Sequence, residues 1–255
     1  MSVSEKEKAL PKQQTAIEVA EEAREKEWKY PSFLSELFLG TARWDLVIPY
    51  PEQSEEDRKK GDEFCAKLEQ FLRQNLDPDE VDRTGELPKR VLDGLAQLGC
   101  FGMNIPTEYG GLGLSQVNYN RAIHLVASYC ASTSVWLSAH QSIGVPKPLV
   151  LFGTPEQKKK YLPLFARGAI SAFALTEPDV GSDPANMSTT ALASEDGSYY
   201  LLNGEKLWCT NGPAADVLVV MAKTAPKIVN GRERKQITAS MPPRRMISCI
   251  TSGKG

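Results

Sequence analysis

The spacing of apolar residues changes near Ala169. Before this point they recur about every 3.6 residues, as on one face of an amphipathic helix, and after it they alternate with a period of two, as in a half-buried strand. A run of helices followed by a run of strands predicts an α+β fold rather than alternating βαβ units. No Gly-x-Gly-x-x-Gly pattern follows a predicted strand, so a Rossmann-type dinucleotide site is not expected.

Capping residues, prolines and glycines mark helix ends along the first 168 residues. Residues 5–28 are rich in Glu, Lys, Ala and Gln and are expected to form a solvated helix. Ser32 is placed to cap a short apolar helix at 33–39, which Gly40 ends. The run Thr154-Pro155-Glu156-Gln157 forms a capping box with Pro at the first helical position. Further helices are predicted at residues 55–76, 88–98, 115–129, 132–143 and 154–167.

Six segments after Ala169 have the residue types and alternation of strands. They cover residues 171–176, 188–193, 199–202, 205–210, 216–223 and 235–239. Asn203-Gly204, the dipeptide that most favours a two-residue turn, stands between the third and the fourth. The sequence therefore predicts a β-hairpin centred on Asn203-Gly204, within a sheet whose strands are joined by hairpins.

The composition is typical of a globular protein. Of the 255 residues 41% are hydrophobic and 24% are charged, and the net charge is −2. Nucleic-acid binding is not expected, because it usually needs a strongly basic surface. The longest apolar runs, such as 217–222, are too short to span a bilayer, and residues 1–9 lack the apolar core of a secretory signal. We expect a soluble cytoplasmic protein, or one of the mitochondrial matrix if the organism is eukaryotic.

Cysteine and histidine give no sign of a metal site or a disulfide framework. The two histidines, His124 and His140, are well separated in the sequence, and each is expected at the surface or at the edge of the core. Zinc sites and disulfide scaffolds need closer grouping of their ligands. Such grouping is absent among the five cysteines, which are Cys65, Cys100, Cys130, Cys209 and Cys249.

Hydroxyl and aromatic side chains gather at the ends of two predicted strands. The segment 173–183 begins as a strand, stops at Glu177-Pro178 and continues as a turn-rich loop, and the segment 208–212 ends the predicted hairpin. Together they carry three hydroxyls and one large flat ring, on Thr176, Ser182, Thr210 and Trp208. This set suits a planar heteroaromatic ligand, which needs a stacking face and hydrogen-bond partners at its edge.

Four segments, in the same order, resemble one protein family. The pattern Thr-Glu-Pro-x-x-Gly-Ser-Asp, followed by Asn-Gly-x-Lys-x-Trp-x-Thr-Asn-Gly, is similar to the flavin-binding β-domain of the acyl-CoA dehydrogenases. Residues 101–113 resemble a helix-to-loop segment of that family's N-terminal domain, and residues 153–163 resemble the helix that leads into its β-domain. Residues 32–38 followed by 49–51 resemble the extension found in the very-long-chain branch.

The resemblance implies FAD as cofactor, fatty acid β-oxidation as the context, and α,β-dehydrogenation of an acyl-CoA thioester as the reaction. In this family a carboxylate removes the α-proton and the β-hydrogen passes as hydride to flavin N5. The partners implied are the acyl-CoA substrate, an acceptor of the electron-transfer flavoprotein type and, in full-length members, further copies of the chain. The implied cofactor-binding residues are Phe173, Leu175, Thr176, Gly181, Ser182, Trp208, Cys209 and Thr210.

The resemblance also implies roles for these residues. Thr176 would hydrogen-bond the flavin edge, Trp208 would pack on the ring, and Cys209 and Thr210 would reach its N5 side. Ser182 would touch both flavin and substrate. Cys209 replaces a β-branched residue of the family pattern, but contact there is mainly through backbone.

No catalytic base is assigned. Glu177 and Glu108 are the candidates, but Glu177 precedes a proline in the motif, where a carboxylate more plausibly holds loop backbone. The family's catalytic glutamate lies in a C-terminal helical domain that has no counterpart in these 255 residues. We therefore expect the chain as given to be inactive.

Other interpretations of the same residues are a core position for Trp208 and an Asx-type turn for Ser182-Asp183. The run 110–113 is expected to be a packing turn rather than a phosphate cradle, because no Lys-Ser/Thr follows it. For the whole chain, the alternative to an enzyme is a non-catalytic binding or scaffold module on the same fold.

The predicted organisation has four parts. An extension at 1–52 is followed by an all-α domain at 53–168, an incomplete antiparallel β-barrel or sheet domain at 169–239, and an aberrant tail at 240–255. The tail begins Ser-Met-Pro-Pro, and its prolines end the last strand early. Our hypothesis is an early stop, after a frameshift near Ala239, with the C-terminal helical domain missing.

Overall fold

The computed structural model describes residues 32–50, 52–229 and 232–242, so the helix predicted at 5–28 and most of the tail lie outside the described residues. The chain divides into two compact units, Met1–Glu52 and Gln53–Gly255. The described part of the first unit holds α3 (Phe33–Phe38) and a 3-10 turn at Trp44–Leu46. The Ser32 side chain accepts a hydrogen bond from Ser35 N, which confirms the predicted cap.

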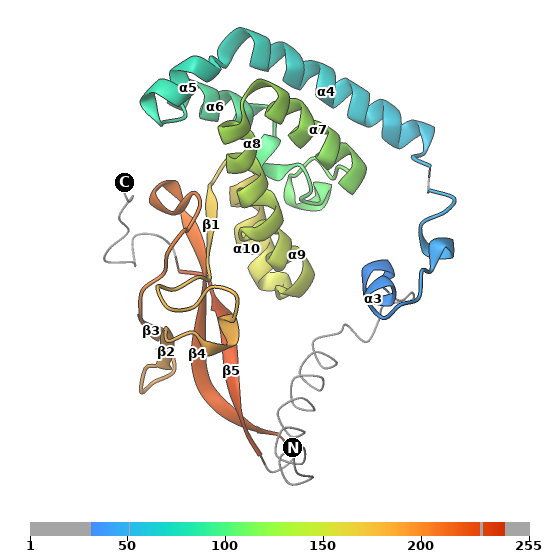
Figure 1. Ribbon diagram of the computed structural model, residues 1–255. Coiled ribbons are helices and arrows are strands. Elements are labelled where there is room, and N and C mark those ends of the chain that lie inside the picture. The colour runs from blue at the N-terminus through green and yellow to red at the C-terminus, as the bar shows by residue number, and fades with distance from the viewer. Residues whose placement is uncertain (1–31, 51, 230–231, 243–255) are drawn as a thin grey trace. The chain divides into compact units, whose positions relative to one another are not determined.

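The second unit begins with helices, as the sequence predicts, and strands follow them (Figure 1). Two of these helices were not predicted, α5 and α9. Asp77-Pro78 ends one helix but also starts the next, because the Asp77 carboxylate caps Asp79 N and Glu80 N. The helices are α4 (Glu55–Asn75), α5 (Pro78–Thr84), α6 (Lys89–Gln97), α7 (Gln116–Tyr129), α8 (Ala131–Ser138), α9 (Pro146–Phe152) and α10 (Pro155–Ala166).

The predicted helix at 132–143 is two elements. After α8 the chain widens into a π-helical turn, Ala139–Ile143. Such turns displace side chains from the regular helical register and often occur at functional or structural junctions. Here the turn carries His140 and Gln141, both buried.

The strands form one mixed sheet, which confirms the α+β class and corrects the expectation of a wholly antiparallel sheet. β1 (Ser171–Ala174) and β2 (Thr190–Ala193) both pair in parallel with β4 (Val217–Val229). β3 (Tyr200–Asn203) pairs antiparallel with β2, and β5 (Arg232–Ser240) pairs antiparallel with β4. The parallel pairs arise because the chain crosses back to β4 through irregular segments, where hairpins alone would alternate strand direction.

The predicted hairpin at Asn203-Gly204 and the predicted strand at 205–210 are wrong. The turn falls instead at Asp196-Gly197, between β2 and β3, where Gly197 has a φ of 69°. The Asp196 carboxylate stabilises this turn by accepting hydrogen bonds from Ser194 Oγ, Ser198 N and Ser198 Oγ. Residues 204–209 are irregular. Asp-Gly is as suited to a tight turn as Asn-Gly, and its own side-chain bonds favour the earlier site.

Of the three apolar clusters in the described part of the second unit, two join its helices to one another and to the sheet. One is buried among the helices and includes Leu68, Leu72 and Leu95. The other lies between the last helices and the sheet, where Leu162 and Phe165 of α10 pack with Val217 and Val219 of β4.

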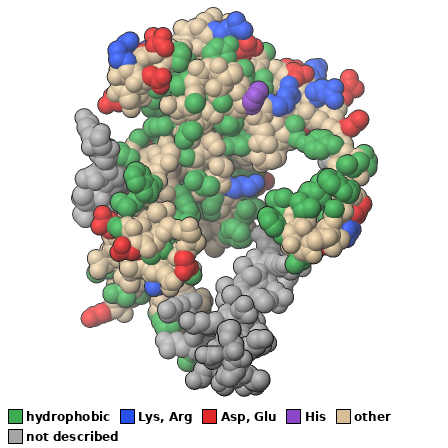
Figure 2. All heavy atoms as spheres, in the orientation of Figure 1, with side chains coloured by type: hydrophobic (Ala, Val, Ile, Leu, Met, Phe, Trp, Pro, Cys, Tyr) green, Lys and Arg blue, Asp and Glu red, His purple; other side chains and the backbone are tan. Residues whose placement is uncertain are grey.

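None of the helices in the described part of the chain has the length and hydropathy needed to cross a bilayer. On the face drawn in Figure 2, acidic and basic side chains are interspersed along the helices.

A buried histidine links the helices to the first strand. His140 has no exposed surface, although each histidine is expected from the sequence at the surface or at the edge of the core, and only His124 is exposed. His140 Nε2 lies 2.9 Å from Phe101 O, and Ser171 N of β1 lies 3.0 Å from His140 Nδ1. A carbonyl only accepts and a backbone N–H only donates, so this geometry requires the neutral imidazole with its hydrogen on Nε2. Burial lowers the pKa of His140 from 6.5 to about 4, although the bond to Phe101 O opposes the shift.

We predict that His140 makes the fold sensitive to acid. The folded state keeps His140 neutral below pH 6.5, whereas the unfolded state binds the proton, so stability present above pH 6.5 is lost as the pH falls toward 4. The shift corresponds to about 3 kcal/mol over that range. Urea unfolding of the parent chain, His140→Gln and the exposed-site control His124→Gln at pH 7 and pH 4.5 measures it. The His124 variant should follow the parent, and equal losses in the parent and His140→Gln would contradict the prediction.

Candidate functional site

The two motif segments lie side by side, although the second is not a strand. Leu207 N donates to Thr176 O at 2.9 Å, and Cys209 Sγ lies 3.3 Å from Phe173 O. These bonds hold residues 206–210 along the carboxyl end of β1. The structure thus brings Phe173, Leu175 and Thr176 together with the segment of Trp208, Cys209 and Thr210.

Trp208 is presented to solvent on strained backbone. Its side chain is 87% exposed, so the core interpretation of this residue is wrong. Its φ of 55° lies in the left-handed region, which is a genuine outlier for a bulky residue. Within the described residues no ring stacks on the Trp208 indole. Strain of this kind persists only where the surroundings impose it, and it is common at ligand sites.

Three predicted site residues have uncommitted hydroxyls. In the part of the chain that the structure describes, the side chains of Thr176, Ser182 and Thr210 make no hydrogen bond. Ser182 and Gly181 lie on an exposed loop that follows a tight turn, in which Glu177 and Val180 exchange two backbone bonds. A free indole face and free hydroxyls are what a flat ligand with a polar edge requires, so these residues fit a flavin.

Glu177 is buried at the centre of this arrangement. It accepts hydrogen bonds from the backbone N and the hydroxyl of both Ser188 and Thr189, at the start of β2. Lys206 Nζ lies 2.8 Å from Glu177 Oε1 and also donates to Leu175 O at 2.9 Å. The Glu177 side chain is 2% exposed and that of Lys206 is 10% exposed. The carboxylate therefore holds loop backbone at Ser188 and Thr189, as the sequence predicted, and its ion pair with Lys206 ties in a second segment.

The same contacts make Glu177 unsuitable as a general base. Burial alone would raise the pKa of its carboxyl, but the hydrogen bonds from Lys206, Ser188 and Thr189 outweigh burial and hold the pKa well below its usual range. A base that binds protons so weakly at neutral pH, and whose oxygens are already occupied, is poorly placed to remove a proton from substrate. The other candidate, Glu108, is exposed in a 3-10 turn, Thr107–Tyr109, in the helical part of the chain.

The run 110–113 is a packing turn. A Cβ on Gly111 would lie 2.1 Å from Ile105 O, so only glycine fits there. Leu112 N and Leu114 N donate to the carbonyls of Gly102 and Met103. These backbone groups are committed to the fold, and the prediction of a structural turn is confirmed.

Sequence reasoning missed Lys206 and Asn211. Lys206 belongs to the pattern Asn-Gly-x-Lys-x-Trp, but a lysine next to Glu205 gives no sign of burial in the sequence. Asn211 is buried, has a φ of 66° and donates from Nδ2 to Trp136 O at 2.9 Å. Asparagine tolerates the left-handed region, which is the one sequence signal that points to this position.

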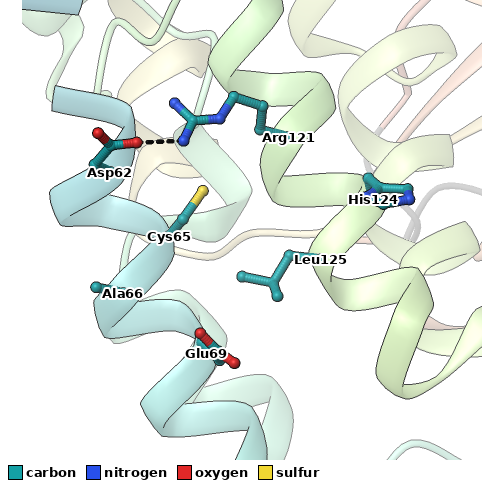
Figure 3. Close-up of a pocket in the computed structure, with 7 residues that line it drawn as sticks. All are labelled: Asp62, Cys65, Ala66, Glu69, Arg121, His124 and Leu125. Carbon is teal, nitrogen blue, oxygen red and sulfur yellow. Dashed lines mark hydrogen bonds and ion pairs between the residues drawn. The ribbon is translucent and has the colours of Figure 1, made fainter. Parts of the chain in front are cut away.

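A shallow hollow between α4 and α7 does not have the features of a second site (Figure 3). Arg121 forms an ion pair with Asp62 across it. Cys65 also lines it, and partial burial raises the pKa of this thiol, which disfavours the reactive thiolate. Among the described residues no group of three His, Cys, Asp or Glu side chains could hold a metal ion.

Comparison with known families gives two consecutive matches. Residues 59–169 match the acyl-CoA dehydrogenase N-terminal domain, and residues 172–246 match the acyl-CoA dehydrogenase middle domain. The two domain types occur in the order that the motifs indicated.

Individual relatives agree. The chain is 52% identical over 211 residues to "Probable acyl-CoA dehydrogenase FadE10" of Mycobacterium tuberculosis, a match that covers 83% of this chain and 32% of that protein. It is 42% identical over 216 residues to the mitochondrial very long-chain specific acyl-CoA dehydrogenase of Mus musculus, covering 84% of this chain and 33% of that protein. The chain thus spans about a third of the length of these curated relatives.

Among solved structures, the chain resembles an acyl-CoA dehydrogenase from Bacillus anthracis complexed with FAD. The TM-score is 0.63 at 35% identity, covering 78% of this chain and 32% of that one. The family's cofactor is the flavin that the Trp208 site was inferred to suit. Two domain matches in sequence order, close curated relatives and a shared fold lead to one conclusion: this chain belongs to the acyl-CoA dehydrogenase family.

Proposed function

We propose that this chain forms the flavin-holding part of an FAD-dependent enzyme that introduces a double bond between the α- and β-carbons of an acyl-CoA thioester. One observation carries the proposal: an exposed, unstacked Trp208 on strained backbone stands in a segment that lies along the end of β1, where the Thr176 hydroxyl is uncommitted. The proposed domain bounds are 1–52 for the extension, 53–168 for the helical domain, 169–239 for the flavin-binding part and 240–255 for the tail.

Each residue of the site has a proposed role. Trp208 covers one face of the isoalloxazine ring and excludes water from it, while Phe173 and Leu175 line its edge. Thr176 and Thr210 hydrogen-bond its polar atoms, and the backbone of Cys209 lies toward the N5 side. Ser182, on the loop with Gly181, contacts both FAD and substrate. When bound, FAD supplies the hydride acceptor.

The proposed partners follow from this chemistry. They are an acyl-CoA thioester, an electron acceptor of the electron-transfer flavoprotein type and, in the whole protein, further copies of the chain. Neither candidate carboxylate is proposed as the base, because Glu177 is fully engaged in hydrogen bonds and Glu108 lies in a turn of the helical part. This engagement favours a second candidate function for a polypeptide of these 255 residues alone, that of a non-catalytic flavin-binding module.

We predict that Trp208→Ala weakens flavin retention. Loss of the stacking face should cost on the order of 1 kcal/mol beyond burial, which is roughly fivefold in the dissociation constant. FAD titration followed by flavin fluorescence measures the change. Trp208→Phe, which keeps a ring, should lose less, and Trp44→Ala serves as the matched control. Equal FAD affinity in the parent chain and Trp208→Ala would remove Trp208 from the site.

We also predict that a polypeptide of these 255 residues has no acyl-CoA dehydrogenase turnover. A positioned general base contributes roughly 100- to 10,000-fold, and the described residues position none at the site. The assay supplies FAD, acyl-CoA thioesters of several chain lengths and an artificial electron acceptor, with a full-length acyl-CoA dehydrogenase as positive control. Turnover above buffer that disappears in Glu177→Gln or Glu108→Gln would identify that carboxylate as the base and refute the prediction.

A further inference from the structure

The site residues lie on three segments that share almost no regular structure. Thr176 follows the end of β1, Ser182 lies on the loop 178–187, and Trp208 lies in the irregular segment 204–209. One backbone bond, from Leu207 N to Thr176 O, joins the first segment to the third. A flavin site needs its contacts fixed to within a fraction of an ångström, so another interaction must hold these segments in place.

One buried ion pair touches all three. Glu177 marks the start of the loop 178–187, and its carboxylate binds Ser188 and Thr189 at the end of that loop, so it closes the loop at both ends. Lys206 reaches across from the third segment to Leu175 O and to the same carboxylate. Because both side chains are almost fully buried, water competes little for these bonds.

Resting on the function proposed above, we propose that Lys206 and Glu177 are positioning residues, whose ion pair sets where Trp208 stands relative to Thr176 and Ser182. Trp208 lies two residues beyond Lys206, on the same irregular segment. Without the ammonium, residues 204–210 keep one backbone bond and the Cys209 thiol contact to β1. Fewer interactions then hold Trp208 at its strained φ, so this residue is expected to relax to another backbone conformation.

The test combines two measurements on the 255-residue chain. Lys206→Gln keeps an amide that can donate a hydrogen bond but removes the charge. It should weaken FAD binding roughly tenfold or more, since a hydrogen bond to a charged group is worth more than a neutral one. The exposed neighbour Glu205 supplies the matched control, because Glu205→Gln also changes one charge in this segment and should leave FAD affinity unchanged.

The second measurement does not need flavin. In chain labelled with 5-fluorotryptophan, Trp208→Phe identifies the Trp208 ¹⁹F resonance and Trp136→Phe that of half-buried Trp136. Lys206→Gln should shift or broaden the Trp208 resonance and leave that of Trp136 in place, whereas general loss of structure would move both. If Lys206→Gln does not fold, Lys206→Arg keeps a buried cation of different shape and should shift the Trp208 resonance in a folded protein.

Each outcome decides the inference. A folded Lys206 variant with the parent's Trp208 resonance and the parent's FAD affinity would overturn it, while leaving the proposed function standing. If the parent chain takes up no FAD, the proposed function fails on that count, and the Trp208 resonance alone decides whether Lys206 positions the segment.

Discussion

The sheet depends on a junction made by one neutral imidazole. His140 accepts a hydrogen bond from the first residue of β1 and donates one to the carbonyl of Phe101, between the rings of Phe101 and Phe165. Ser171 Oγ also accepts a hydrogen bond from Val145 N, so the start of β1 is bonded both to His140 and to the residue before α9. β1 then sets the register of β4, and the end of β1 sets the place of Glu177. The helical part therefore defines where the segments of the proposed flavin site begin.

Much of the helical part could be predicted from the sequence, because its signals are local. Ser115 and Thr154 accept hydrogen bonds at helix starts, as their positions suggested. The structure differs from the prediction where one residue both ends a helix and caps the next, and where tertiary packing determines the local backbone. Asp77 ends one helix and caps the next, and the π-helical turn after α8 places His140 and Gln141 inward, which no periodicity of 3.6 indicates.

The sheet and the site were harder to predict, because they depend on contacts between distant residues. Asn203-Gly204 and Asp196-Gly197 are equivalent turn signals as dipeptides. The hydrogen bonds of the Asp196 side chain and the pairing of Thr190 with Asn203 place the turn at the second. The motif predicted that Thr176 and the Trp208 segment share one site, and the structure does bring these two segments side by side. It could not indicate that Lys206 is buried, because a lysine is buried only where a carboxylate elsewhere in the chain is available to pair with it.

The left-handed backbone at Trp208 separates what stabilises this fold from what the proposed flavin site requires. A non-glycine residue in that conformation costs about 1–2 kcal/mol, a penalty that glycine does not carry. A sequence optimised for stability alone would therefore place glycine at position 208 and discard the indole. Stabilised versions of this protein obtained by design or by selection for heat resistance need that position held constant, since the most direct gain in folding free energy there removes the indole that the proposed flavin site requires.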